Sequence, residues 1–324
     1  MYSTKELLEK VNQALEANNI SKQPEGLYQP ITYVLSLGGK RIRPVMTLMA
    51  YNLYKDDVTP ALLPAIGLET YHNFTLLHDD LMDRADVRRG KPTVHKKWND
   101  NTAILSGDNM LIMAMQRISQ CDAAHLPAVV ALFTKTAIEI DEGQQYDMDF
   151  ENRDDVTENE YLEMIRLKTS VLLACALKMG AILADAPESD AEALYEFGEK
   201  IGLAFQLQDD YLDVYGDFET FGKQIGGDIM CNKKTYMLIN AQLMAQGEQS
   251  DELRYWIAKE NADRDQKVKA VTRIYTELGI PELAQQRINE YFSEAMNCLD
   301  KVQLPQERKE MLHELAMKLL KRKS

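Results

Sequence analysis

Cysteine is scarce in this sequence, which has 4 in 324 residues, at positions 121, 175, 231 and 298. These positions form no CxxC or Cys/His spacing, which argues against a disulfide-stapled module and against structural zinc, and we expect free thiols in a reducing compartment. Long apolar runs are lacking too, because the most apolar stretch, residues 170–186, is interrupted by Lys178. The first residues have no signal-peptide pattern. The sequence therefore predicts a cytoplasmic protein without stable membrane insertion.

Basic residues are in the minority, with 37 Lys and Arg against 51 Asp and Glu and a formal net charge of −14. A field of this sign repels the backbones of nucleic acids and anionic lipids, so we expect no nucleic-acid partner. The composition does not indicate disorder, because 45% hydrophobic and 27% charged residues are ordinary for folded globular domains.

The spacing of apolar residues is helical along nearly the whole chain. One face, for example, repeats in steps of three and four through Leu63, Ile66, Thr70, Phe74, Leu77 and Leu81. Glycine and proline breaks leave room for long helices between them, and none resembles an interdomain linker. No repeat of solenoid length occurs. We expect an all-α fold in a single domain over residues 1–324.

One acidic motif, DDxxD, occurs twice, at Asp79–Asp83 and at Asp209–Asp213, each time within an apolar helical pattern. Carboxylates at i and i+4 lie on the same face of a helix. Magnesium prefers oxygen ligands and is typically held by one or two carboxylates together with substrate phosphates. A single motif could be a solvated acidic turn, but two copies beside apolar residues predict a diphosphate clamped through magnesium between helices.

Basic residues lie close to both acidic motifs. Before and after the first motif stand Lys40, Arg41, Arg43, Arg88 and Arg89, and after the second stand Lys223, Lys233 and Lys234. Arginine binds phosphate through two parallel hydrogen bonds and lysine binds it as a point charge. Each of these side chains by itself could be an ordinary surface charge, but the set indicates a phosphate site.

From roughly Gly38 to Lys234, seven segments resemble, in order, the trans-isoprenyl diphosphate synthases of the polyprenyl synthetase family: GGKRIRP, HNFTLLHDDLMD, RRGKPTVH, EGQQYD, LKTS, FQLQDDYLDVYGD and GKQIGGDIMCNKKT. The resemblance implies a helical bundle around a deep central cavity, a homodimer and a prenyltransferase of isoprenoid biosynthesis. It also implies a magnesium-dependent condensation of isopentenyl diphosphate with an allylic diphosphate.

The resemblance implies a role for individual residues as well. The magnesium ligands are Asp79, Asp83 and Asp209, supported by Asp80, Asp210 and Asp213. Isopentenyl diphosphate is bound by Lys40, Arg43, His72 and Arg89. The allylic diphosphate is bound by Arg88, Lys168, Lys223 and Lys233. Gln144 and Asp147 line the cavity, while Thr169 and Gln206 place oxygen dipoles near the reacting carbons.

The implied chemistry needs no protein nucleophile. Magnesium and basic side chains would stabilise the departing diphosphate as the carbon–oxygen bond ionises, and the double bond of isopentenyl diphosphate would attack the allylic cation. The released diphosphate would accept the final proton. Water must be excluded, because it would trap the cation.

Product length in this family depends on the side chains four, five and eight positions before the first aspartate, which are here Thr75, Phe74 and Tyr71. Thr75 is small and the first motif has the short spacing, so the resemblance implies geranylgeranyl diphosphate as the main product and farnesyl diphosphate as the next choice. The helical wheel leaves a second interpretation open. Phe74 lies about 140° around the helix from Asp79 and could be a core residue.

Three other functions are compatible with parts of the sequence. A class I terpene cyclase shares the first motif, but usually carries an Asn/Ser/Glu metal motif where this chain has Asp209–Asp213. An HD-type metal phosphohydrolase is suggested by His72 and by the His78–Asp79 pair. An inactive regulatory subunit is the third, although such subunits usually lose aspartates that this chain keeps. The basic residues 321–323 resemble a tail that closes over the isopentenyl diphosphate site, or are a solvated helix end.

Overall fold

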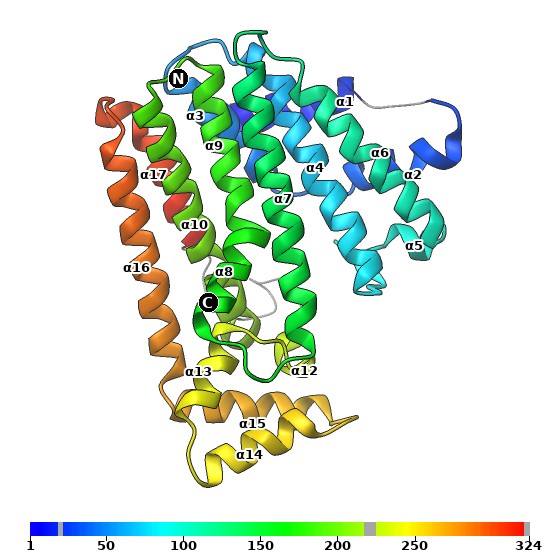
Figure 1. Ribbon diagram of the computed structural model, residues 1–324, viewed down its shortest axis with the longest axis vertical. Coiled ribbons are helices and arrows are strands. Elements are labelled where there is room, and N and C mark those ends of the chain that lie inside the picture. The colour runs from blue at the N-terminus through cyan, green and yellow to red at the C-terminus, as the bar shows by residue number, and fades with distance from the viewer. Residues whose placement is uncertain (19–21, 217–224, 321–324) are drawn as a thin grey trace. The chain divides into compact units, whose positions relative to one another are not determined.

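The computed structural model describes residues 1–18, 22–216 and 225–320, and nearly all of its regular structure is helical (Figure 1). Within these residues the only strands are β1 (Val87–Arg88) and β2 (Lys91–Pro92), which have two residues each. The prediction of an all-α fold is confirmed. The chain divides into two compact units, which are described separately.

The first unit comprises residues 1–134, 175–194 and 304–311. Its own elements are α1 (Thr4–Ala17), α2 (Glu25–Ser36), α3 (Ile42–Asn52), the 3₁₀ turn η1 (Thr59–Ala61), α4 (Leu62–Met82), β1, β2, α5 (Val94–Lys97) and α6 (Asp100–Ile118). Helices α4 and α6 lie side by side (Figure 1). They approach closely because α4 has a glycine at Gly67, where a Cβ atom would lie 2.7 Å from Ile118 Cγ1.

A short hairpin follows the first acidic motif and carries two of the predicted phosphate ligands. β1 and β2 pair antiparallel, with Arg88 opposite Lys91. The two loop residues, Arg89 and Gly90, have φ of 52° and 73°. Positive φ at both central residues is the pattern of a type I′ turn, whose twist matches that of the paired strands. The hairpin therefore holds Arg88 and Arg89 at fixed positions beyond the C-terminus of α4.

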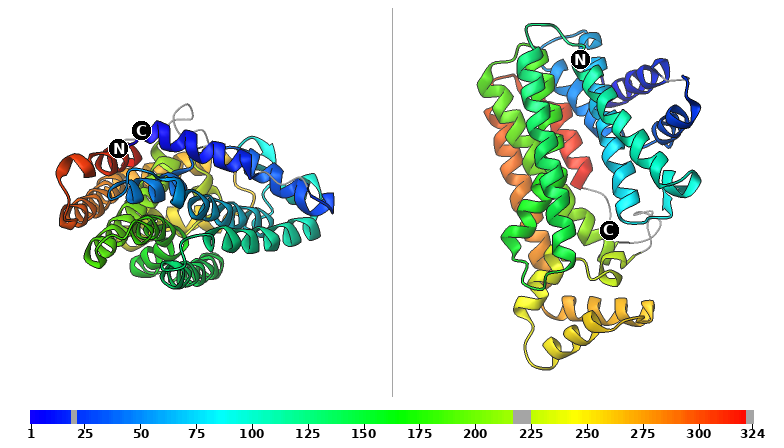
Figure 2. Two further views of the ribbon diagram at one scale, coloured as in Figure 1. Left: turned by 90° about the horizontal axis from the view of Figure 1, so that it is seen from above. Right: turned by 45° about the vertical axis from the view of Figure 1, so that its right-hand side comes forward.

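The second unit comprises residues 135–174, 195–303 and 312–324. Its own elements are α8 (Glu158–Ile165), the π-helical turn η2 (Arg166–Ser170), α12 (Gly227–Met230), α13 (Tyr236–Met244), α14 (Glu248–Ala258), α15 (Arg264–Glu277) and α16 (Ile280–Lys301). Four further helices contribute residues to both units: α7 (Leu126–Glu151), α9 (Val171–Leu183), α10 (Glu188–Tyr215) and α17 (Gln306–Leu320). Helices α14 and α15 lie side by side (Figure 2).

No helix in the described ranges is long and apolar enough to cross a membrane. Lys223 and the basic residues 321–323 lie outside the described residues. A single domain over residues 1–324 stays a prediction.

Candidate active site

The first acidic motif occupies the last turn of α4. Asp79 and Asp80 are the fourth-last and third-last residues of the helix, which ends at Met82, and Asp83 is its C-cap. Asp80 is 5% exposed, and its two carboxylate oxygens each accept a hydrogen bond of 2.8 Å from Arg88 Nε. Arg88 Nη2 also lies 3.8 Å from Asp79 Oδ2. Arg88 therefore ties the hairpin to the motif, while Asp79 and Asp83 are the more accessible carboxylates of the three.

Carboxylates at this end of a helix need a compensating cation. The C-terminus of α4 presents the negative end of the helix dipole, so three aspartates there repel both it and one another. Burial raises the pKa of Asp80 to about 6 despite the positive charge of Arg88. Asp79 and Asp83 stand at i and i+4, one turn apart on one face. Two carboxylates in this arrangement suit magnesium, which is usually held by one or two carboxylates while waters and phosphate oxygens fill its other coordination positions.

A cationic pocket of about 520 Å³ lies further toward the N-terminus of α4. We use the name cationic pocket for the space lined by Leu37, Gly39, Lys40, Arg41, Ile42, Arg43, Glu69, His72 and Arg89. Arg43 Nη1 and His72 Nε2 are 3.1 Å apart. Burial, and then the charge of Arg43, lower the pKa of His72 well below its ordinary value. The imidazole is therefore neutral and accepts a hydrogen bond from Arg43.

The cationic pocket has unused capacity to donate hydrogen bonds to an anion. Arg43 Nε is buried and has no hydrogen-bond partner among the described residues. Burial lowers the pKa of Arg43 to about 10, which leaves it charged at neutral pH. Arg89 reaches the same pocket from the hairpin, and its guanidinium donates a hydrogen bond to the carbonyl oxygen of Gly38. All four residues predicted to bind isopentenyl diphosphate therefore line one pocket, namely Lys40, Arg43, His72 and Arg89.

The second acidic motif lies near the end of α10, where Asp210 and Asp213 accept hydrogen bonds from groups of the same unit. Asp210 is 4% exposed and accepts hydrogen bonds from the hydroxyl of Tyr161 and, at 3.0 Å, from Gln206 Nε2. Asp213 Oδ2 accepts a hydrogen bond of 2.9 Å from the backbone N–H of Asp228. Asp209 is half-buried. The motif therefore combines structural carboxylates with one at a more accessible position.

Lys233 brings positive charge to the second motif. Its ammonium lies 3.9 Å from Asp228 Oδ1. Burial alone would lower the pKa of Lys233, but the carboxylates of Asp228 and Asp210 outweigh it and raise that pKa. Burial raises the pKa of Asp210 to about 7, and the charge of Lys233 opposes this rise. Lys234 pairs with a different carboxylate, since its Nζ lies 3.2 Å from Asp154 Oδ1.

Lys168 and Thr169 lie in the π-helical turn η2, a deviation from α-helical geometry that is frequent at functional sites. Lys168 Nζ is 2.6 Å from Asp147 Oδ2, and Thr169 Oγ1 donates to Gln206 Oε1 at 3.3 Å. Glycines on both neighbouring helices make room for the turn. A Cβ at Gly143 would lie 2.4 Å from the amide nitrogen of Lys168, and one at Gly202 would lie 2.6 Å from Ser170 Cα. Gln144 is half-buried on α7 beside these residues.

The predicted chain-length residues differ in their surroundings. Tyr71 is 1% exposed, and its ring packs edge-on against Phe133 with 5.1 Å between centroids. Phe74 is half-buried and contacts the rings of Tyr71 and His78 at 5.5 Å and 4.8 Å. The Thr75 hydroxyl donates to the carbonyl oxygen of His72 within α4. Tyr71 is thus a core residue, and Phe74 keeps part of its ring exposed.

His78 is engaged by α6. The His78 Nε2 atom lies 3.2 Å from the carbonyl oxygen of Ile104. A Cβ atom at Gly107 would lie 2.1 Å from His78 Nε2. Among the described residues, no three His, Cys, Asp or Glu side chains are grouped as a preformed metal site.

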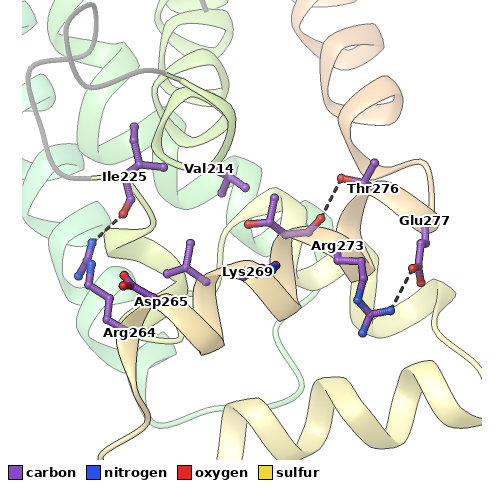
Figure 3. A pocket seen from close by; sticks show the side chains of 10 residues that line it. Val214, Ile225, Arg264, Asp265, Lys269, Arg273, Thr276 and Glu277 are labelled. Atoms are coloured by element: carbon purple, nitrogen blue, oxygen red, sulfur yellow. Dashed lines mark hydrogen bonds and ion pairs between the residues drawn. The ribbon is translucent and has the colours of Figure 1, made fainter.

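A separate groove of about 590 Å³ in the second unit is lined by α15 together with Val214 and Ile225 (Figure 3). Arg264 Nη2 donates to the carbonyl oxygen of Ile225 at 2.7 Å, and Arg273 Nη1 lies 2.9 Å from Glu277. None of the predicted site residues that the structure describes lines this groove. Arg264 fixes the backbone that leads into α12 and Asp228. The groove therefore lies next to the segment that holds Asp213 through the backbone N–H of Asp228.

Sequence reasoning missed three residues that shape these surroundings, namely Tyr161, Asp228 and Glu69. Asp228 follows a glycine pair, which is a detectable turn signal. Tyr161 follows a polar segment and begins an apolar pattern with Leu162, Met164 and Ile165, so it resembles any core tyrosine. Nothing in its local pattern indicates that its hydroxyl bonds to a carboxylate 49 positions away.

Comparisons with known proteins agree with this chemistry. The family model for polyprenyl synthetase matches residues 24–275. A geranylgeranyl diphosphate synthase from Methanosarcina mazei is 40% identical over 280 residues, which cover 86% of this chain and 84% of the relative. A crystal structure of a geranylgeranyl pyrophosphate synthase is 44% identical, covers 100% of both chains and superposes with a TM-score of 0.95. A geranylgeranyl pyrophosphate synthase from Corynebacterium glutamicum, complexed with isoprenyl diphosphate and magnesium, is 27% identical over 99% of this chain and 98% of its own, with a TM-score of 0.86.

Proposed function

The chain belongs to the polyprenyl synthetase family and is a prenyltransferase of the short-chain class, and we propose that it makes mainly geranylgeranyl diphosphate. The substrates are isopentenyl diphosphate and an allylic diphosphate, and farnesyl diphosphate is the next choice of product. Names of the similar proteins support this product length. The terpene cyclase, the phosphohydrolase and the inactive subunit gain no support from them.

One observation carries the proposal, namely that α4 contributes both to the cationic pocket and to the first acidic motif. His72 borders the cationic pocket and Asp79 begins the acidic motif seven residues later on α4. At about 1.5 Å of rise per residue, the two positions are roughly 10 Å apart along the helix. One site binds a diphosphate directly through cations, and the other needs a metal ion between carboxylate and diphosphate. Two diphosphate substrates bound in different ways are what a condensation of this kind requires.

Magnesium is the proposed metal, held by Asp79, Asp83 and Asp209. The donor set fits, because it consists of carboxylates alone and the two on α4 stand on one face. Bound magnesium would supply Lewis-acid stabilisation of the departing diphosphate. A homologous synthase whose structure contains magnesium and isoprenyl diphosphate supports the choice of magnesium as the metal.

The protein side chains do the remaining work in the proposed mechanism. Lys40, Arg43 and Arg89 bind the diphosphate of isopentenyl diphosphate and fix its double bond toward the allylic carbon. Arg88, Lys168, Lys223 and Lys233 neutralise the leaving diphosphate as the carbon–oxygen bond breaks. Thr169 and Gln206 direct oxygen dipoles toward the allylic cation, and Gln144 and Asp147 line the space around it. The diphosphate released from the allylic substrate takes the last proton.

A homodimer is part of the proposal. Helix α6 exposes apolar side chains on one face, with Ile104, Leu105 and Ile112 being 46%, 60% and 67% exposed. Leu105 and Ile112 are seven residues apart and point in nearly the same direction. A second copy of the chain would bury this stripe. The cytoplasmic location stays a prediction.

The test is a product assay. Purified protein is incubated with magnesium, isopentenyl diphosphate and each of the dimethylallyl, geranyl and farnesyl diphosphates, and the products are identified by mass. We expect a C20 product and no turnover once the divalent cation is chelated. Failure to consume isopentenyl diphosphate with any primer would overturn the proposal. A released terpene hydrocarbon would point to the cyclase instead.

A further inference from the structure

A buried ion pair underlies the cationic pocket. Arg41 Nη1 lies 2.6 Å from Glu69 Oε1, and the two residues are 7% and 2% exposed. Glu69 Oε1 also accepts a hydrogen bond of 3.0 Å from Asn73 Nδ2. Within the described part of the chain, Glu69 is the single carboxylate that lines this pocket. A carboxylate in a pocket for a diphosphate opposes binding by its charge, so it needs another reason to be there.

The carboxylate of Glu69 fixes Arg41, which connects two helices. Its Nη2 donates to the carbonyl oxygen of Leu35 at 2.7 Å, so one guanidinium joins α4 to the end of α2. Arg41 is also the N-cap of α3 and has φ of 49°, in the left-handed region that costs energy for a residue with a Cβ atom. The anchored side chain stabilises this backbone. It thereby sets the positions of Lys40 and Arg43, its near neighbours in sequence.

The ion pair also affects the other arginines of the pocket. Burial lowers the pKa values of Arg43 and Arg89, and the negative charge of Glu69 partly opposes this decrease in both. Arg89 packs against the loop that Arg41 anchors, because a Cβ at Gly39 would lie 2.9 Å from Arg89 Nη2. Without a counterion, the three guanidinium groups would repel one another in the absence of substrate.

We propose that Glu69 is a positioning residue for the isopentenyl diphosphate subsite, which it serves by fixing Arg41 and by holding the cations of the pocket together. Arg41 itself is not a phosphate ligand, because its guanidinium is committed to Glu69 and Leu35. The inference rests on the proposed function, which assigns the pocket to isopentenyl diphosphate. It adds two residues whose contribution to binding is indirect.

The Glu69→Gln variant separates positioning from simple electrostatics, because the two predict opposite signs. If the carboxylate only repels the substrate, removing its charge lowers the KM for isopentenyl diphosphate. If it positions the pocket, that KM rises. We expect a rise of about tenfold or more, with the KM for the allylic diphosphate within twofold and kcat within threefold of the wild type. An unchanged or lowered KM for isopentenyl diphosphate would overturn the inference.

The matched control is Glu158→Gln. Glu158 also accepts from one arginine and one asparagine, with Arg287 Nη2 at 2.7 Å and Asn240 Nδ2 at 3.3 Å, but it lies in the second unit. This variant should leave both KM values unchanged. Thermal unfolding of both variants shows whether each is folded, and Glu69→Asp, which keeps the charge, should recover part of the lost affinity.

A binding measurement keeps the inference independent of turnover. Calorimetric titration with inorganic pyrophosphate, without divalent cation, should show weaker binding to Glu69→Gln than to the wild type and to Glu158→Gln. If the wild type binds pyrophosphate but makes no prenyl product, the proposed function fails while the positioning role is still tested. Equal pyrophosphate affinity in all three proteins would refute the positioning role.

Discussion

Replacing Gly202 by alanine should damage both stability and catalysis through the π-helical turn η2. Gly202 lies on α10, opposite the turn that carries Lys168 and Thr169. A Cβ atom at position 202 would lie 2.6 Å from Ser170 Cα, 2.7 Å from Ser170 Cβ and 2.7 Å from Ser170 Oγ. All three distances are shorter than any normal carbon contact, and one of the atoms is backbone. The turn must therefore move, or α10 must move away from it.

The size of the effect follows from two opposing contributions. Overpacking a close-packed interior costs about 1–3 kcal/mol. We expect the upper end, because Ser170 is fully buried and its hydroxyl lies 3.4 Å from the carbonyl oxygen of Ile165. Alanine returns about 0.8–1 kcal/mol through its higher helix propensity. The free energy of unfolding should fall by about 2 kcal/mol. Because misplacing reacting groups by about 1 Å can cost a hundredfold in rate, kcat should fall at least about tenfold.

Urea denaturation and steady-state kinetics measure the two effects. The control is Gly26→Ala, in the first turn of α2, where a Cβ would meet nothing within 4 Å. This control should be as stable as the wild type or slightly more stable, with unchanged kcat. If Gly202→Ala unfolds at the wild-type urea concentration, or retains kcat within twofold, then the close approach of α10 does not hold the turn.

Three further predictions concern the metal motifs, product length and assembly. Asp79→Ala and Asp209→Ala should each lower kcat by about a thousandfold or more, because a loss of about 4 kcal/mol of transition-state stabilisation corresponds to that factor at 1.36 kcal/mol per factor of ten. Asp86→Ala, which lies outside the motif, should leave kcat unchanged. Near-normal turnover in either motif variant would refute the proposal that both motifs hold magnesium. Phe74→Ala should lengthen the product by one or more isoprene units, detected by mass spectrometry, and an unchanged product would place the limiting wall elsewhere. Ile112→Glu should convert a dimer to a folded monomer in light scattering, and a persistent dimer would exclude this face of α6 as the interface.

Local features of the fold could be predicted because they depend on neighbouring residues in sequence. Apolar residues repeat with helical spacing, and capping boxes begin α1 at Ser3 and α8 at Thr157. The acidic motifs belong to the same class of feature, since i and i+4 carboxylates share a helix face wherever the helix packs. The resemblance to a family rests on such motifs in their order, and the comparisons confirm it.

The surroundings of each motif residue could not be predicted, because they depend on contacts between segments far apart in sequence. The resemblance implied that Arg88 binds the allylic diphosphate, and the structure shows that its guanidinium donates to Asp80, a contact that no sequence pattern indicated. Phe74 could either limit the product length or be a core residue, and a helical wheel could not decide between these roles. The wheel gives the direction of the side chain but not the residues that it contacts, which are the rings of Tyr71 and His78.

The sequence by itself determined the helices, the six aspartates, the basic segments beside them and hence the class of reaction. Only the tertiary structure decided which of these charges are buried and what each one contacts. Glu69 and Arg41 are 28 positions apart, and Tyr161 and Asp210 are 49 apart. Each pair meets because helices pack around apolar side chains, and burial then makes an unpaired charge too costly to leave without a partner.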